Sequence, residues 1–165
     1  MHVNETDLDW DEYDREGATF RRKELSTAAD ADELGCSLYE LPPDARSWPY
    51  HYHTANEEAL YVLAGDGRLR APDGARSLTA GGFVSFPADE RGAHRVVNDA
   101  DEPLRYLMFS TMREPDLTVY PDSETVGVFV GAPPGGRDER SLHGFYDLED
   151  DLAFWESVAD AAEDS

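Results

Sequence analysis

Three histidines and one glutamate in this sequence are spaced so that they could hold a metal ion. His51 and His53 are separated by one residue, and because alternate side chains of a β-strand lie on one face, both imidazoles can point into the same interior. Glu58 begins the next expected strand and His94 opens a later one, so the four meet only if the chain folds back on itself. Three imidazoles and a carboxylate suit one divalent transition metal ion: Fe, Mn, Ni, Co, Cu or Zn.

Each part of this pattern also has an ordinary explanation. Two histidines one residue apart are commonly just exposed, and a single histidine such as His94 is more often a hydrogen-bonded core or loop residue. Glu58 stands beside Glu57 and could be surface charge in an acidic chain. The combination is harder to dismiss, because three of the five histidines occupy inward-compatible positions in apolar strands. The other two, His2 and His143, are expected to be unrelated.

The strands that would position these residues are indicated by short apolar runs between turn signals. Such runs occur at 34–41, 58–63, 83–86, 94–98 and 104–110. Turn signals at intervals of about eight to twelve residues are typical of an antiparallel sandwich or barrel. The sequence therefore predicts an all-β fold.

The remaining segments complete the expected organisation. We expect an edge strand at 18–25, whose charges discourage further pairing, extended chain at 117–130 and an acidic helix at 148–162 packed on the barrel or a neighbour. The chain then divides into an acidic lead-in at 1–17, a barrel with an extended arm at 18–130, and a linker with the terminal helix at 131–165.

The net charge of the chain disfavours some classes of binding partner and suggests the conditions in which the protein works. Asp and Glu number 36 against 14 Lys and Arg, for a formal net charge of −22, which disfavours binding to nucleic acid or to an anionic membrane. No apolar run reaches the roughly 18 residues of a membrane-spanning helix. We interpret the acidity as adaptation to concentrated salt, where repulsion between carboxylates is screened. Because Cys36 is the only cysteine and the first residues are acidic rather than signal-like, we expect a cytoplasmic protein without an intramolecular disulfide.

Two stretches around the candidate ligands resemble the cupin family. HYHTANEEALYVLAG, at 51–65, matches the first cupin motif: His-x-His, four residues, Glu, six residues, Gly. GGFVSFPADERGAHRVVN, at 81–98, resembles the second motif. It departs from it where Asp89 replaces the usual glycine and two extra residues precede His94. We expect Gly92 to take over the turn.

The resemblance implies a fold, ligands and an assembly. The fold is the double-stranded β-helix, a cupin jelly-roll barrel, here with a short C-terminal helix. Many members are homodimers to which an N-terminal strand contributes. The implied metal ligands are His51, His53, Glu58 and His94, and the implied turn-shaping residues are Gly65, Gly81 and Pro87.

For function, the sequence favours a metal-dependent enzyme that binds a small molecule in the barrel. A dioxygenase or related oxidoreductase is slightly ahead; the alternatives are a non-catalytic small-ligand binding or sensing cupin and a sugar-phosphate isomerase-like enzyme. No catalytic residue beyond the ligands is identified. The isomerase is less attractive because phosphate requires cations, and the nearby candidates are Arg46, Arg70, Arg95 and Arg105. The expected inward residues are Leu60, Val62, Val84, Phe86 and Val96, with Tyr39, Tyr106, Phe109 and Met112 at the barrel mouth or in plain core.

Overall fold

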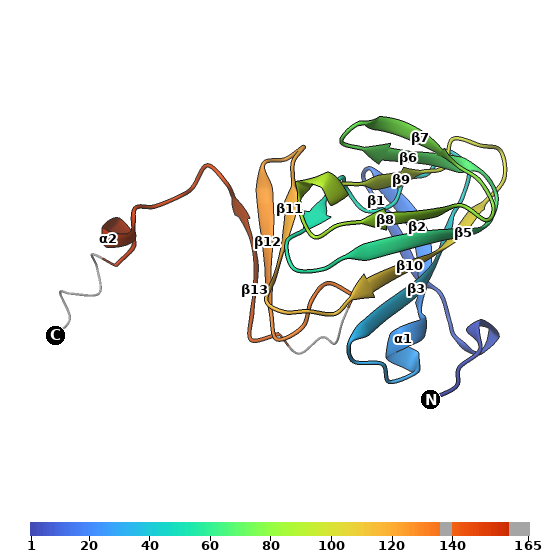
Figure 1. The fold of residues 1–165 in the computed structure, drawn as a ribbon, viewed down its shortest axis with the longest axis horizontal. Coiled ribbons are helices and arrows are strands. Elements are labelled where there is room, and N and C mark those ends of the chain that lie inside the picture. Colours follow the sequence, from blue (N-terminus) through green and yellow to red (C-terminus); the bar gives the residue numbers. More distant parts are fainter. Residues whose placement is uncertain (136–139, 159–165) are drawn as a thin grey trace.

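The computed structural model describes residues 1–135 and 140–158, in which three antiparallel sheets wrap around a common interior (Figure 1). The largest sheet has the order β1-β2-β3-β10-β5-β8. Its strands are β1 (Asp11–Arg15), β2 (Ala18–Glu24), β3 (Leu34–Leu41), β5 (Glu58–Ala64), β8 (Phe83–Phe86) and β10 (Leu104–Thr111). The fold is thus all-β, as expected.

Two smaller sheets complete the barrel. One has the order β13-β12-β11-β4 and the other β7-β6-β9. Their strands are β4 (Tyr52–His53), β6 (Gly67–Ala71), β7 (Gly74–Leu78), β9 (Arg95–Val97), β11 (Asp116–Tyr120), β12 (Thr125–Val130) and β13 (Leu142–Asp147). The described helices are short: α1 (Leu25–Ala28), α2 (Phe154–Ser157) and 3-10 turns at Glu5–Asp7 and Glu90–Gly92. Neither α1 nor α2 is long and apolar enough to cross a membrane.

The core follows from the two-residue alternation of the strands. Leu60 and Val62 on β5 are fully buried, and Leu104 and Tyr106 on the adjacent β10 are buried beside them. Glu58 lies on the same face of β5, so the apolar alternation that anchors the strand also turns this carboxylate inward. The sequence correctly predicted this placement.

The N-terminal region differs from the expectation. The strand expected at an edge, β2, is paired on both sides, and β1 is the edge strand within the segment expected to be a lead-in. The charges of β2 do not prevent pairing because neighbouring groups take them up: Arg21 pairs with Glu40 at 2.6 Å and Lys23 Nζ donates to the carbonyl oxygen of Glu5. On β1, Tyr13 stacks on Phe20 with ring centroids 4.7 Å apart.

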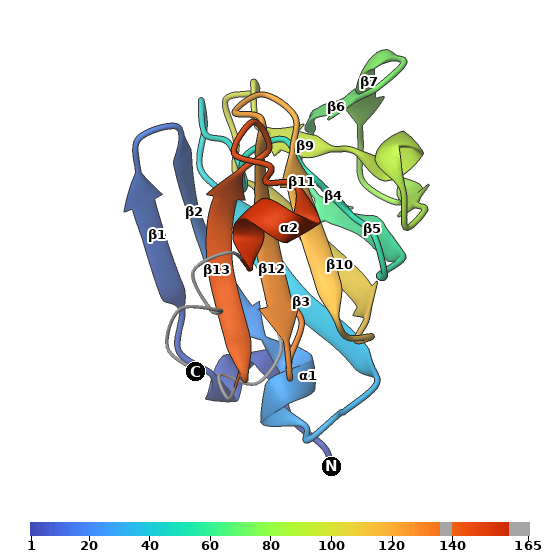
Figure 2. The ribbon, with the colours of Figure 1, turned by 90° about the vertical axis from the view of Figure 1, so that its left-hand side faces the viewer.

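The C-terminal region also differs. β13 pairs with β12 inside the segment expected to hold a linker and a helix. The described part of the expected helix at 148–162 is helical only over α2, and residues 159–165 lie outside the described part. The chain after β13 leads away from the barrel, and α2 lies in front of β12 and β13 in Figure 2. Trp155 is 78% exposed, so the helix lacks the packing that stabilises short helices.

Candidate metal centre and its cavity

The four candidate ligands are brought together by strand pairing. His51 and His94 form an isolated antiparallel bridge in which His94 N donates to His51 O at 2.9 Å and His51 N to His94 O at 3.2 Å. His53 lies on β4, two residues beyond His51, and Glu58 begins β5. Donor atoms of His51, His53 and Glu58 lie within 4.8 Å of one another. The structure therefore places all four predicted residues in one cluster.

The glutamate at the centre of the cluster has an unusual oxygen. Glu58 Oε2 lies 3.6 Å from His53 Nε2 and 3.5 Å from His94 Nε2, too far for good hydrogen bonds. This oxygen is buried and has no hydrogen-bond partner among the described residues. Two ligands that each bind one ion at about 2.1 Å are separated by roughly 3 to 3.5 Å. A cation would satisfy the oxygen at this spacing.

The three imidazoles are oriented through their other nitrogen. The Nδ1 atom of His51 lies 2.7 Å from Pro49 O, that of His53 lies 2.6 Å from Asp116 Oδ2, and that of His94 lies 2.9 Å from Gly92 O. Because each of these oxygens is an acceptor, Nδ1 carries the hydrogen and the Nε2 lone pair is left for another partner. The donor set and its orientation fit a divalent transition metal.

The electrostatics of the cluster favour a positive charge near His53. Burial, with a contribution from His94, holds the pKa of His51 well below its usual value, and burial likewise lowers the pKa of His94. Burial lowers the pKa of His53 too, but Glu58 and Asp116 outweigh it, and the pKa is raised. A cation bound at Nε2 would take the place of the proton that these carboxylates favour.

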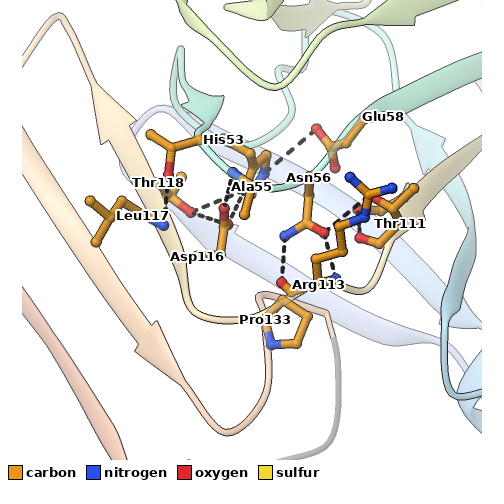
Figure 3. Close-up of polar contacts among 12 residues, drawn as sticks. His53, Ala55, Asn56, Glu58, Thr111, Arg113, Asp116, Leu117, Thr118 and Pro133 are labelled. Carbon is orange, nitrogen blue, oxygen red and sulfur yellow. Dashed lines mark hydrogen bonds and ion pairs between the residues drawn. The ribbon is translucent and has the colours of Figure 1, made fainter.

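Asp116 contacts the candidate site and was not predicted from the sequence. It is fully buried, and its two oxygens accept from His53 Nδ1 and from Ala55 N at 3.0 Å (Figure 3). It precedes the segment expected to be extended and, by alternation, shares a face of β11 with Thr118, which is also buried. Two polar side chains on one face of a strand were the signal that could have revealed it.

Replacing Asp116 with asparagine is expected to weaken metal binding about 10- to 100-fold. Asparagine has one acceptor oxygen where aspartate has two, so it cannot serve both Ala55 N and His53 Nδ1. Competition with a chromophoric chelator measures the affinity for Zn(II). Asp122→Asn is the matched control, because Asp122 is exposed and pairs with Arg70 at the surface. Equal affinities of Asp116→Asn and the unaltered chain would contradict the orienting role.

A second missed residue, Asn56, ties the loop before Glu58 to the end of β10. Its Oδ1 accepts from Arg113 N at 2.7 Å and from Thr111 Oγ1 at 3.2 Å, and its Nδ2 donates to Arg113 O at 3.0 Å (Figure 3). Only 2% of its surface is exposed. These bonds fix the chain between the histidine pair and Glu58.

The departure from the second motif is accommodated by a short turn before His94. Asp89 caps the 3-10 turn Glu90–Gly92 by accepting a hydrogen bond from Arg91 N at 2.9 Å. A side chain on Gly92 would collide with the carbonyl oxygen of Pro87. The structure therefore confirms that Gly92 takes over the tight turn, and the ring of His94 stacks on Phe86 at 3.9 Å.

The cluster opens into a cavity of about 280 Å³ between the six-stranded and four-stranded sheets. Tyr39, Tyr106 and Met112 line it, as the sequence analysis allowed, whereas Phe109 is not part of its described lining. Cys36 is half-buried and lines it as well, and burial raises the pKa of its thiol. The residues expected to line the interior instead form the core behind the site: Leu60, Val62, Val84, Phe86 and Val96.

The cations of the cavity also differ from those expected. The described lining includes Arg22 from β2 and Arg140 from the segment before β13, and none of Arg46, Arg70, Arg95 and Arg105. Arg22 had been assigned to a charged sheet edge, and Arg140 to a linker.

The extended segment 117–130 lies within the same barrel, because β11 pairs with β4.

Comparisons with known proteins agree with this geometry. The family model described as "Cupin domain" matches residues 37–110. A protein of Acidithiobacillus ferrooxidans named as a candidate sugar phosphate isomerase is 28% identical with a TM-score of 0.70, covering 83% of this chain and 81% of that one. The polyketide cyclase RemF of Streptomyces resistomycificus is 25% identical with a TM-score of 0.58, covering 67% and 78%.

A further solved structure shows the same fold at lower identity. A sugar phosphate isomerase of the cupin superfamily from Silicibacter pomeroyi is 24% identical with a TM-score of 0.69, covering 86% of this chain and 83% of that one. Among curated proteins, none matches the sequence. The family match, the jelly-roll sheets and the clustered histidines and glutamate agree, and the chain contains a cupin domain at residues 37–110.

Proposed function

We propose that this chain is a divalent-metal-dependent enzyme that converts a small molecule in its cavity, by a dioxygenase or related oxidoreductase reaction. The observation that carries the proposal is the buried, unpartnered Oε2 of Glu58 among oriented imidazoles, at the wall of a cavity of about 280 Å³. Small-molecule sites are typically such concave, largely apolar spaces with a few converging polar groups.

The metal would be held by His51, His53, Glu58 and His94. A divalent metal bound there supplies a Lewis acid, and a redox centre where the metal is iron. The side chains around it bind and orient the substrate. Those that supply aromatic or thioether surface are Tyr39, Trp48, Tyr106, Met108, Met112, Tyr120, Phe129 and Phe145.

Tyr39 can donate a hydrogen bond into the cavity without carrying a charge. Its hydroxyl accepts a hydrogen bond from Trp48 Nε1 at 3.0 Å, so its own proton can be donated to a substrate oxygen. Burial raises the pKa of Tyr39 despite the opposing effect of Arg22, so the hydroxyl keeps its proton at neutral pH. Tyr39 therefore positions a polar substrate group without adding charge.

We rank the oxidoreductase reaction first because few carboxylates line the cavity. Glu58 is the one carboxylate in the described lining of the cavity. An aldose–ketose isomerisation moves a proton between neighbouring carbon atoms and needs a base beside the substrate, whereas Glu58 is engaged as a ligand in our proposal. Oxidation of a substrate by dioxygen makes a smaller demand on a separate base.

A sugar-phosphate isomerase-like reaction is the second candidate. It is favoured by the 28% identity to the Acidithiobacillus ferrooxidans protein over most of both chains. Arg22 and Arg140, which line the cavity, could supply the cations that a phosphate requires. The homodimer, the cytoplasmic location and the adaptation to concentrated salt stay predictions from the sequence.

Oxygen uptake and substrate loss test the proposal. We expect the chain loaded with Fe(II) to consume oxygen with at least one member of a panel of catechols, thiols and keto acids, and His94→Ala to lose this activity. Interconversion of sugar phosphates without oxygen uptake would instead establish the second candidate. Tight ligand binding without turnover of any compound would overturn the enzyme proposal in favour of a binding or sensing protein.

A further inference from the structure

A largely buried arginine faces the cavity outside the metal cluster. Arg22 lies on β2, its side chain is 12% exposed, and it lines the cavity together with Tyr39 and Trp48. Its guanidinium carbon lies 5.4 Å from the centre of the Tyr13 ring and 5.9 Å from that of Trp48. The arginine is therefore held in place by aromatic rings from β1 and from the segment before the histidines.

The hydrogen bonds of Arg22 leave part of the guanidinium unused. Nη2 donates to Tyr13 Oη at 3.0 Å and pairs with Glu24 Oε1 at 2.5 Å. The Nε atom is buried and has no hydrogen-bond partner among the described residues. Nη1 lies on the side of Gly135, another lining residue, whose Cβ, if present, would be 3.9 Å away. The guanidinium also interacts with the hydroxyl of Tyr39, which lines the cavity. A ligand in the cavity would therefore meet the guanidinium on the side of Nη1 and Tyr39, and not at the buried Nε.

A second arginine lies at the wall of the same cavity. Arg140 also lines it and is fixed by donating from Nε to Ala132 O at 3.1 Å and from Nη2 to Pro133 O at 3.2 Å. Glu58 is the one carboxylate in the described lining, and Glu24 pairs with Arg22 from outside it. Arginines are scarce in a chain of net charge −22, so two of them around one cavity are unusual. Their presence there favours an anionic ligand.

We propose that Arg22 is the anion-recognition group of this cavity and binds the carboxylate or phosphate group of a small substrate, with Arg140 as a second cation. The guanidinium donates charge-assisted hydrogen bonds to such a group, and the rings of Tyr39 and Trp48 contact the adjoining apolar part. The reaction at the other end of the substrate, beside the metal cluster, is the one given under the proposed function, and the inference rests on that proposal. It narrows the substrate class to small anions.

A purely structural role is the competing explanation for Arg22. Its contacts with Tyr13 and Glu24 could serve only to hold β1 against the barrel. Under that explanation, substitution changes the stability of the fold but not the preference of the cavity for anions. The test therefore compares a charged probe with a neutral probe of the same shape.

The experiment titrates the full chain with benzoate, inorganic phosphate and neutral benzamide, using calorimetry at fixed ionic strength. It is done with the Zn(II)-loaded chain and again after treatment with a chelator, because a carboxylate can also bind the metal directly. We expect Arg22→Gln to weaken benzoate and phosphate binding at least 10-fold in both forms and to leave benzamide binding within twofold. Arg76→Gln, at an exposed arginine of the β6–β7 hairpin, is the matched control and should change nothing.

Arg22→Lys keeps the test decisive if Arg22→Gln is unstable. Lysine retains the charge but not the planar set of donors, so we expect anion binding between that of the unaltered chain and that of Arg22→Gln. Anion binding that is the same in both variants and the unaltered chain would overturn the proposal. So would an unaltered chain that binds benzamide as tightly as benzoate.

Failure of this proposal and failure of the proposed function give different results. If Arg22-dependent anion binding persists but no metal binds and no substrate is converted, the anion site stands and the enzyme proposal fails. If metal binds and turnover occurs but the variants bind anions normally, the anion site fails alone. Metal content measured on each variant separates these cases.

Discussion

Replacing His53 with alanine is expected to remove most of the bound divalent metal. His53 Nε2 is one of the nitrogen atoms that face Glu58 Oε2, and its ring is fixed by the 2.6 Å contact with the buried Asp116. Loss of a partner that only orients a ligand typically costs about 10- to 100-fold in affinity, so loss of the ligand itself should cost more. Elemental analysis of the purified chain and a competitive Zn(II) titration measure the effect.

His2→Ala is the matched control for His53→Ala. His2 is an exposed histidine of the N-terminal segment, far from the cluster in sequence and absent from the cavity lining. We expect its replacement to leave both metal content and affinity unchanged. If His53→Ala retained its full metal content, the metal would be held by other residues.

Replacing Asn98 with alanine is expected to destabilise the fold by about 3 kcal/mol. Asn98 is fully buried, and its Nδ2 donates to the carbonyl oxygens of Leu41, Pro42 and Glu102 at 2.9 to 3.0 Å. Its Oδ1 accepts from Ala100 N at 3.0 Å. Alanine would remove these buried bonds, which tie the turn between β9 and β10 to the end of β3. Urea unfolding followed by tryptophan fluorescence measures the loss.

Asn4→Ala is the comparison for this second prediction. Asn4 makes an equivalent side-chain cap, accepting from Thr6 N at 3.0 Å, but it is exposed to solvent that replaces the lost bond. We expect a change of no more than about 0.5 kcal/mol there. If the two substitutions lowered the unfolding midpoint equally, burial of the Asn98 bonds would not be the source of its contribution.

The candidate ligands could be predicted from the sequence because their placement depends on local alternation. The pair His51 and His53 shares a face at a separation of two residues, and Glu58 follows the same rule as the buried Leu60 and Val62. The turn glycines are equally local, since a tight backbone approach such as that at Gly92 is open only to a residue without a side chain.

The expectations that failed depended on what a segment packs against. The charges of β2 suggested a sheet edge, but Glu40 and the carbonyl oxygen of Glu5, both distant in sequence, take up two of them and allow β1 to add alongside. The periodicity after residue 148 suggested a helix, yet no described surface covers Trp155, and the helix is limited to Phe154–Ser157. The helical periodicity of a segment shows only that one face of it could pack against another element. That packing supplies most of the stability of a helix in a protein.

By itself, the sequence determined the jelly-roll pattern of strands and the four side chains that could meet around a cation, since both follow from alternation and turn chemistry along short stretches. Tertiary structure alone decided that Asp116 orients His53 across 63 residues and that Arg22 faces the cavity. It also placed the predicted apolar residues behind the site rather than around the cavity. These contacts join distant segments, and only the pairing and packing of whole sheets determines which distant groups meet.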